Sequence, residues 1–263
     1  MNNVDRNLLK TCLNCNSLLK SRRVNFCKPP SYCRYEYQLK QRDLKAYNIL
    51  SNKDSNFYYL IGLICTDGTL RYPKDDKLKN IGYSFSISVS INDIEIINSL
   101  QNLFGGKTTT RKDNTVNWYI SNKKFVEYLL NVVGLTSNKT YSLNVSKWFE
   151  SLEQKFKIDF LRGVIDGDGS IKIFNKHFRT FNICTASESF KDMIVSFLTT
   201  YYSDNVKVEK NKSRNYYYIR YNGRYMIDFL NDIYNNLSKK IYLKRKYNTF
   251  IEIKNFFNTY GNK

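Results

Sequence analysis

Two aspartates in closely similar surroundings are the residues of this chain best suited to chemistry. Asp67 lies near the end of the segment YLIGLICTDG (59–68), and Asp168 lies near the end of FLRGVIDGDG (160–169), 101 residues later. Each is expected in the last turn of a helix, where the helix dipole disfavours a carboxylate by up to about 1 kcal/mol. If the two helices pack side by side, the two anions also repel each other. We therefore predict that Asp67 and Asp168 hold a divalent cation such as Mg²⁺, which prefers oxygen ligands.

Small residues recur within the same two segments. Gly62 and Thr66 are four positions apart, as are Gly163 and Gly167, so each pair forms a flat stripe on one helix face. Two such stripes allow helices to approach closely. The last glycines of the two segments are expected in the left-handed conformation that ends a helix, and their backbone supplies candidate further Mg²⁺ ligands: Gly68 and Gly169. A core helix capped by an Asp-Gly turn explains one such segment, but not two at a fixed offset.

Four of the six cysteines fall within the first 33 residues. Their spacing is C-x2-C, eleven residues and C-x5-C, formed by Cys12, Cys15, Cys27 and Cys33. Four thiolates complete a tetrahedral Zn²⁺ site that leaves no open position, so this zinc would be structural. Metal binding would then supply the folding energy of a short segment. Two disulfides and free thiols are the alternatives, whereas the isolated Cys65 and Cys184 are expected in the core.

The charge balance of the chain favours a polyanionic partner. The sequence contains 42 Lys and Arg against 23 Asp and Glu, a net charge of +19, which points first to nucleic acid and second to an acidic membrane surface. No apolar run approaches the roughly 18 residues of a membrane span. The single His177 excludes chemistry that needs several histidines and makes a Ser-His-Asp triad a poor hypothesis. Residues 1–10 lack a signal peptide, so we expect a cytoplasmic protein at the nucleoid of a prokaryote or phage-infected cell, with an organelle as the alternative.

The elements expected after each aspartate also repeat. In both copies an alternating strand-like stretch is followed by an amphipathic helix, a basic two-strand region and another helix, at 84–91, 93–104, 107–121 and 123–133 and again at 180–187, 188–201, 206–221 and 224–235. This order predicts an α+β fold of two pseudo-symmetric αββαββα repeats whose antiparallel sheets form a saddle. The expected domains are a zinc module at 1–38, a linker at 39–56, and repeats at 57–150 and 151–263.

One face of the expected sheets suits contact with DNA. Serines alternate with apolar residues at Ser84, Ser86, Ser88 and Ser90, which gives a flat polar face able to lie in a major groove. Further candidates come from the basic and hydroxyl residues nearby, namely Arg111, Lys112, Lys172, Arg179, Thr185, Ser187, Lys207, Lys210, Lys212, Arg214 and Arg220. A register error of one residue would reverse the face that each of them occupies.

The paired segments resemble the two motifs of a single-chain LAGLIDADG homing endonuclease, over residues 56–263. The matching positions are Leu60, Gly62, Leu63, Ile64, Asp67 and Gly68, and Leu161, Gly163, Ile165, Asp166, Asp168 and Gly169. Cys65 departs from the motif where the family has its first aspartate. The resemblance implies a monomeric nuclease that makes a double-strand break with Mg²⁺ or Mn²⁺. It implies catalytic roles for Asp67 and Asp168, and for a basic residue after the last helix of each repeat, Lys139 and Lys240, with Lys239 as the alternative to Lys240.

Two other functions remain open at the level of the sequence. The same scaffold serves non-cleaving nucleic-acid binders, such as an intron RNA maturase or a transcription regulator. A zinc-dependent interaction protein with an incidental basic surface is the second alternative. If the protein does bind double-stranded DNA, the divergence between the repeats predicts a long, non-palindromic site. The zinc module would extend the footprint or anchor the protein to flanking DNA.

Overall fold

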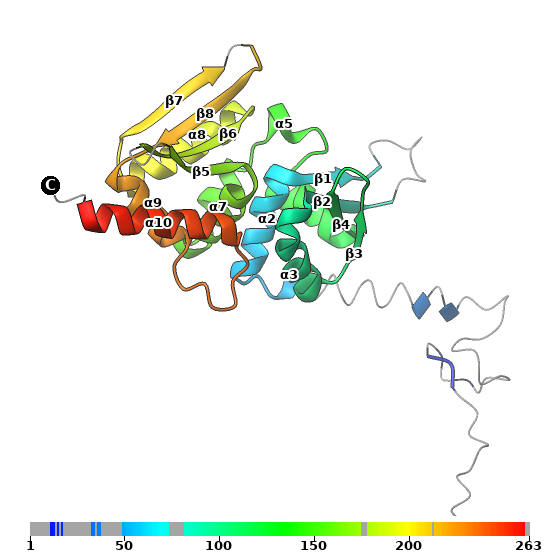
Figure 1. The fold of residues 1–263 in the computed structure, drawn as a ribbon. Coiled ribbons are helices and arrows are strands. Elements are labelled where there is room, and N and C mark those ends of the chain that lie inside the picture. Colours follow the sequence, from blue (N-terminus) through cyan, green and yellow to red (C-terminus); the bar gives the residue numbers. More distant parts are fainter. Residues whose placement is uncertain are drawn as a thin grey trace, which may run out of the picture. The chain divides into compact units, whose positions relative to one another are not determined.

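The computed structural model describes residues 11–13, 15, 17, 33–34, 36–37, 49–73, 82–174, 178–211 and 213–260 of the chain (Figure 1). The chain divides into two compact units, Met1–Asn48 and Ile49–Lys263. The described residues of the first unit are few and include three cysteines. The second unit contains both repeats.

The first repeat builds a four-stranded antiparallel sheet in the order β1-β2-β4-β3. Its elements, in chain order, are α2 (Ser55–Asp67), β1 (Gly68–Arg71), β2 (Ser84–Ser90), the 3₁₀ helix η2 (Ile91–Asp93), α3 (Ile94–Phe104), β3 (Lys107–Thr110), β4 (Thr115–Ser121), α4 (Lys123–Tyr128), the π-helical turn η3 (Leu129–Val133), α5 (Lys139–Ser142) and α6 (Ser146–Glu150).

The second repeat builds a sheet of the same topology, in the order β5-β6-β8-β7. Its elements are α7 (Gln154–Asp168), β5 (Gly169–Phe174), β6 (Phe178–Thr185), α8 (Glu188–Tyr201), β7 (Val206–Asn211), β8 (Tyr216–Tyr221), α9 (Arg224–Ile233) and α10 (Lys244–Tyr260). The predicted α+β fold with two similar repeats is confirmed. Within the described residues, no helix has both the length and the apolar character needed to cross a membrane.

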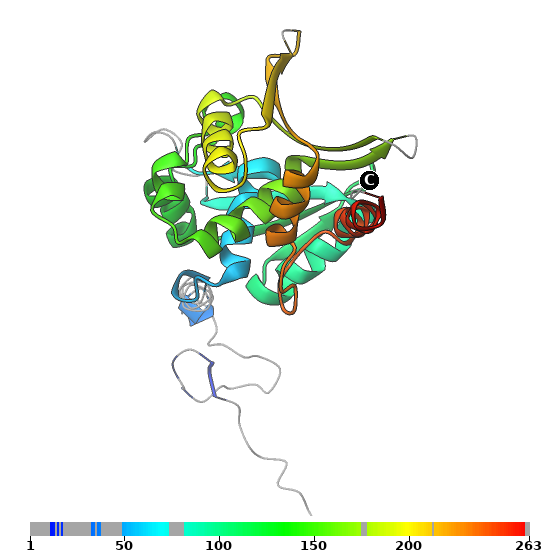
Figure 2. The ribbon, with the colours of Figure 1, turned by 90° about the vertical axis from the view of Figure 1, so that its left-hand side faces the viewer.

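Helices α2 and α7 lie side by side between the two sheets (Figures 1 and 2). Helix α2 begins where the Asp54 carboxylate accepts hydrogen bonds from the backbone N–H groups of Asn56 and Phe57, both 3.0 Å long. Its residues 56–65 are all buried, as expected of a helix that is apolar on every side. Packing on both sides therefore fixes the direction in which α2 delivers its last residue, Asp67.

The small residues of the two segments meet at the α2–α7 contact. A Cβ atom added to Gly62 would collide with the carbonyl oxygen of Phe160, and one added to Gly163 would collide with that of Tyr59. The same Cβ of Gly163 would also lie 2.8 Å from the backbone nitrogen of Leu63. Each helix therefore touches the backbone of the other, as the small-residue stripes predict.

The glycines that follow the two aspartates do not adopt the predicted left-handed conformation. Gly68 has φ −83° and ψ 149°, and Gly169 has φ −75° and ψ 148°, which is extended backbone. Each glycine is already the first residue of a strand, so the helix passes directly into the sheet. A Cβ on Gly169 would lie 2.5 Å from the carbonyl oxygen of Ile165. This close approach, and not a positive φ, accounts for glycine at both positions.

Each sheet packs one face against helices and leaves the other face open. Phe85 and Ile87 of β2 and Trp118 of β4 are at most 1% exposed, whereas the serines between them on β2 are half-buried or exposed. Helices α3 and α4 contact the first sheet, and α8 contacts the second, where Phe181 and Ile183 are fully buried. We call the opposite side of each sheet its open face.

Candidate functional site

The two aspartates of the sequence motifs come together where α2 and α7 end. A Cβ added to Gly167, which precedes Asp168 in the chain, would lie 2.9 Å from Oδ2 of Asp67. Asp67 is half-buried, and Asp168 is exposed. The close packing of the helix ends, which the small residues permit, thus brings one carboxylate from each repeat to a common position.

Electrostatics oppose two negative charges at this position. Burial, followed by repulsion from Asp168, raises the pKa of Asp67 to about 6, although Lys246 and Lys139 act to lower it. Desolvation by the packed helix ends also raises the pKa of Asp168, against the same two lysines. A pair of carboxylates that is costly to ionise is a donor set that fits a hard divalent cation. The residues present therefore fit the predicted Mg²⁺ or Mn²⁺.

A lysine caps the end of each of the two helices. Nζ of Lys139 donates hydrogen bonds to the carbonyl oxygens of Cys65 and Thr66, both 2.7 Å long. Lys139 therefore lies beside Asp67, as expected from the sequence. A cation is favourable at a helix C-terminus because it offsets the negative end of the dipole. Burial nevertheless lowers the pKa of Lys139.

The second lysine is Lys246, and the prediction of Lys240 was wrong. Nζ of Lys246 donates to the carbonyl oxygens of Ile165 and Asp166 at 2.7 Å and to that of Gly167 at 3.2 Å. Burial lowers the pKa of Lys246 to about 8.

Lys240 binds instead to Asp159, with Nζ 3.2 Å from Oδ1, more than two helical turns from the end of α7. The physical reason is a longer connection in the second repeat. Lys139 follows the end of η3 by six residues, whereas Lys246 follows the end of α9 by thirteen, so the offset of 101 selects the wrong lysine. Lys246 could have been identified by its position in the first turn of the last helix.

The open face of the first sheet carries the predicted serines. Ser84, Ser86 and Ser88 line a hollow of about 400 Å³. Its other lining residues are Thr69, Arg71, Arg111, Asn117 and Tyr119. The strand register explains the grouping, because Ser86 pairs with Thr69 on one side and with Tyr119 on the other. Arg71 was not among the predicted residues, since the strand that carries it is only four residues long.

Two further predicted residues of the first repeat lie at the rim of this face. Ser90 is exposed at the end of β2, where its Oγ accepts a hydrogen bond from the backbone N–H of Asn92 at 3.3 Å. Lys112 is exposed in the turn between β3 and β4. Both are accessible to a partner, but neither belongs to the hollow.

The open face of the second sheet also carries basic side chains. Lys207 and Asn182 flank Arg220 as its cross-strand neighbours, and Lys172 on β5 pairs with Thr180. These positions alternate with the buried Ile171, Ile183 and Ile219. A guanidinium nitrogen of Arg220 also lies 3.0 Å from the Glu209 carboxylate. Arg214 is exposed in the turn between β7 and β8.

Three predicted DNA contacts do not lie on the open face of the second sheet. Thr185 and Lys210 both pair with Tyr217, whose ring lies 4.9 Å from Nζ of Lys191 on α8. They therefore point to the helix side, and the reason is the one-residue register error that period-2 strands allow. Ser187 is 1% exposed, and its Oγ donates to the carbonyl oxygen of Leu143 at 2.6 Å while capping α8.

Some predicted residues lie beyond what the structure describes. Cys27 and Lys212 are outside the described residues. Of Arg179 the structure describes the backbone, which pairs with Ile173. Their predicted roles remain predictions.

Three of the four N-terminal cysteines come together. The sulfur atoms of Cys12, Cys15 and Cys33 lie within 4.8 Å of one another, and the sulfurs of Cys15 and Cys33 are 3.7 Å apart. This spacing exceeds the roughly 2.05 Å of a disulfide. It matches thiolates that share a tetrahedral zinc ion, since Zn–S bonds are about 2.3 Å long. The donor set therefore fits Zn²⁺.

The two remaining cysteines have different surroundings. Cys65 is 3% exposed in the core, as predicted. Cys184 is half-buried and pairs with Tyr218, between the helix-facing Ile183 and Thr185, so it lies on the open face of the second sheet. The prediction of a core position was wrong for Cys184.

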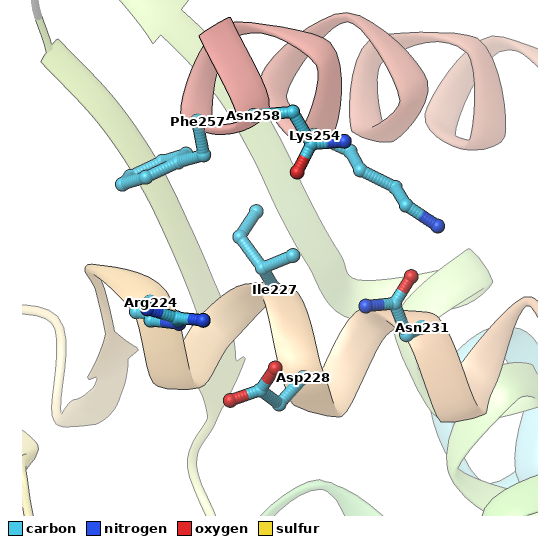
Figure 3. Close-up of a pocket in the computed structure, with 7 residues that line it drawn as sticks. All are labelled: Arg224, Ile227, Asp228, Asn231, Lys254, Phe257 and Asn258. Atoms are coloured by element: carbon cyan, nitrogen blue, oxygen red, sulfur yellow. The ribbon is translucent and has the colours of Figure 1, made fainter. Parts of the chain in front are cut away.

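Another hollow, of about 470 Å³, lies between α9 and α10 (Figure 3). Its walls carry the polar side chains of Asp228 and Asn231 from α9, and Lys254 and Asn258 from α10. Neither of the paired aspartates lines it. We therefore assign the candidate site to the ends of α2 and α7.

Comparison with protein families finds two adjacent matches. Residues 60–149 match the family described as LAGLIDADG endonuclease, and residues 155–234 match the family described as LAGLIDADG-like domain. Together these matches span most of the second unit and contain both aspartate segments. No curated protein sequence is similar enough to the chain to count as a match.

Solved structures of homing endonucleases share the fold. The structure of I-DmoI in complex with DNA and Mn is 17% identical, with a TM-score of 0.52, and the match covers 70% of this chain and 99% of that one. The meganuclease I-SmaMI bound to uncleaveable DNA is 16% identical, with a TM-score of 0.51, and the match covers 77% of this chain and 89% of that one.

Proposed function

Because the chain belongs to the LAGLIDADG endonuclease family, we propose that it is a homing endonuclease that cuts both strands of a specific double-stranded DNA site. One observation carries the proposal. The C-terminal ends of α2 and α7 bring Asp67 and Asp168 together, and a lysine caps each end. Each helix end thus contributes one carboxylate and one ammonium group to the site.

The residues of the site divide the work of phosphodiester hydrolysis. Asp67 and Asp168 would hold Mg²⁺ or Mn²⁺, which when bound supplies an activated water and stabilises the leaving oxygen. Lys139 and Lys246 place positive charge beside the carboxylates, where it would stabilise the negative charge that develops on the phosphate. Because burial lowers the pKa of Lys246 to about 8, its ammonium form predominates at neutral pH.

The two open faces would bind DNA in different ways. The first presents hydroxyl and amide groups at Ser84, Ser86, Ser88 and Asn117, which suit hydrogen bonds to base edges in a major groove. The second presents Lys172, Lys207 and Arg220, which suit contacts to phosphates. Since the two repeats differ, the target is non-palindromic, and one chain carries both halves of the site as a monomer.

The cysteine cluster would act as a structural zinc site. Cys12, Cys15 and Cys33 provide three thiolates, and Cys27 is the fourth ligand by its spacing. The purified full-length protein should contain one zinc ion, and Cys33→Ser should lower the zinc content. Cys184→Ser should leave it unchanged, and equal zinc content in all three proteins would contradict the assignment.

Cleavage of a plasmid that carries the cognate site tests the nuclease. With Mg²⁺, the natural protein should linearise the plasmid, whereas Asp67→Asn and Asp168→Asn should bind the site but cut neither strand. The matched control is Asp204→Asn, an exposed carboxylate between α8 and β7, which should cut normally. Specific binding without any cleavage by the natural protein would instead favour the non-cutting binder, an RNA maturase or transcription regulator.

A further inference from the structure

The second lysine of the site reaches it by a connection that the first repeat lacks. Residues 234–243 join α9 to α10, and we call this segment the strap. Lys246 follows the strap by three residues. The position of its ammonium group therefore depends on how firmly the strap is held.

Side chains of the two central helices hold the backbone of the strap. Nε of Arg162, which is fully buried, donates to the carbonyl oxygen of Ile241 at 3.0 Å. Asn56 accepts from the N–H of Ile241 at 2.8 Å and donates to the carbonyl oxygen of Lys239 at 2.9 Å. Lys239 has φ +69°, a conformation that costs free energy in a residue other than glycine. The surrounding hydrogen bonds therefore maintain a strained path.

Asp166 binds both ends of the strap. Its carboxylate accepts hydrogen bonds from the Tyr234 hydroxyl at 3.1 Å, from the Leu243 N–H at 2.8 Å and from the Tyr59 hydroxyl at 3.0 Å. It is 4% exposed, so these bonds form away from water. The Asp166 backbone carbonyl also accepts from Nζ of Lys246 at 2.7 Å. One buried residue thus joins the strap to the lysine that the strap delivers.

The first repeat has no equivalent of this arrangement at the matching positions. Cys65 stands where Asp166 stands in the second repeat, and a buried thiol is a weak hydrogen-bond acceptor. Phe160 is the counterpart of Tyr59 and has no hydroxyl group. Lys139 follows η3 through a connection of five residues. The two lysines are therefore positioned by different means.

We propose that Asp166 is a positioning residue for Lys246 and that it makes the two strand-cutting sites unequal. The site that contains Lys246 depends on the buried carboxylate, whereas the site that contains Lys139 does not. The effect on DNA rests on the proposed nuclease function. The placement of Lys246 is a property of the protein alone and can be measured without DNA.

Chemical modification of the full-length protein tests the placement of Lys246. In Asp166→Asn one acceptor becomes an N–H donor that faces the donors of the strap. We expect reductive methylation with formaldehyde, measured by peptide mass spectrometry, to rise several-fold at Lys246 and to stay unchanged at Lys139. Tyr234→Phe removes a single bond to Asp166 and should raise modification of Lys246 less.

The matched control is Asp232→Asn, which disrupts another tyrosine–carboxylate bond of the same repeat, from the Tyr202 hydroxyl at 2.7 Å. Asp232→Asn should leave the reductive methylation of Lys246 and Lys139 unchanged. Unchanged modification of Lys246 in both Asp166→Asn and Tyr234→Phe would overturn the proposal. So would an equal rise at Lys246 and Lys139, because that pattern indicates general loosening of the fold.

Strand-resolved cleavage tests the consequence for catalysis. On a duplex with a different label on each strand, Asp166→Asn should slow one strand by roughly 10- to 100-fold and leave the other within about twofold, because small displacements of catalytic groups have effects of this size. Nicked duplex should then accumulate. Equal slowing of both strands would overturn the inequality. If the natural protein cuts no DNA, the nuclease proposal fails, and the modification experiment still decides whether Asp166 positions Lys246.

Discussion

At the scale of the residue, the paired aspartates should make the metal-free protein less stable than it could be. The folded state raises the pKa of Asp67 from 3.8 to about 6, so it retains a proton that the unfolded chain loses. Stability therefore falls as the pH rises from about 4 to about 6, and the whole penalty is present above that range. Without Mg²⁺, we expect Asp67→Asn to raise the unfolding free energy by about 1–2 kcal/mol at pH 7.5.

Urea denaturation at two pH values measures this effect. The gain from Asp67→Asn should disappear near pH 3, where the Asp67 carboxyl is protonated in the folded state and largely so in the unfolded state. Added Mg²⁺ should stabilise the natural protein more than the variant. A variant that is less stable than the natural protein at pH 7.5 would show that burial and the neighbouring Asp168 do not disfavour the ionised Asp67 carboxylate.

The two candidate lysines of the second repeat should respond differently to the same substitution. Lys246→Met removes the ammonium group that binds three carbonyl oxygens at the end of α7, and it should reduce double-strand cleavage at least about 100-fold while binding persists. Lys240→Met removes one of the partners of Asp159, which keeps Arg162 at its side. It should lower the melting temperature slightly and retain cleavage. If Lys240→Met lost more cleavage activity than Lys246→Met, Lys240 would be the lysine that acts at the site.

At the scale of the element, the contact between α2 and α7 leaves no room for a methyl group. Gly163→Ala would press a Cβ atom against the backbone of Tyr59 and Leu63, which cannot move aside as a flexible side chain can. We expect a loss of about 3 kcal/mol or more in unfolding free energy. Gly82→Ala is the control, because a Cβ there meets nothing within 4 Å. Thermal unfolding of both variants measures the difference, and similar melting temperatures would contradict the close contact.

The repeated elements were predictable because each rests on a local pattern. Alternation of serine with apolar residues fixes β2, and small residues four apart fix the face on which α2 meets α7. The register of β6, β7 and β8 was not predictable, because tyrosine suits either face of a strand, and Thr185 and Lys210 consequently lie on the side opposite to the one expected.

The constant offset of 101 residues between the repeats could not predict the length of the strap either. The hydrogen bonds that hold it, such as that from Arg162 to Ile241, join residues 79 positions apart. No local pattern reports such a bond. Lys246 was therefore missed, whereas Lys139, which follows a short connection, was found.

At the scale of the whole molecule, a net charge of +19 should make DNA binding depend steeply on salt. If roughly 8 to 10 phosphates are neutralised, the logarithm of affinity should fall with the logarithm of salt with a slope of about −7 to −9. Fluorescence anisotropy over a range of NaCl concentrations measures the slope. Lys207→Ala on the open face should make it shallower by about 1, whereas Lys191→Ala on the helix side should not. A slope shallower than about −2 would exclude binding through phosphates.

The backbone contact between α2 and α7 constrains how such a protein can be recombined. Gly62 lies against Phe160 and Gly163 lies against Tyr59. The surfaces of α2 and α7 are therefore complementary to each other, and neither helix can be exchanged by itself. A chimera that takes a whole repeat from a relative would join two surfaces that were never matched. A graft that begins after residue 68 or residue 169 would keep the native pair of helices α2 and α7. It would introduce only a new sheet, and with it a new DNA preference.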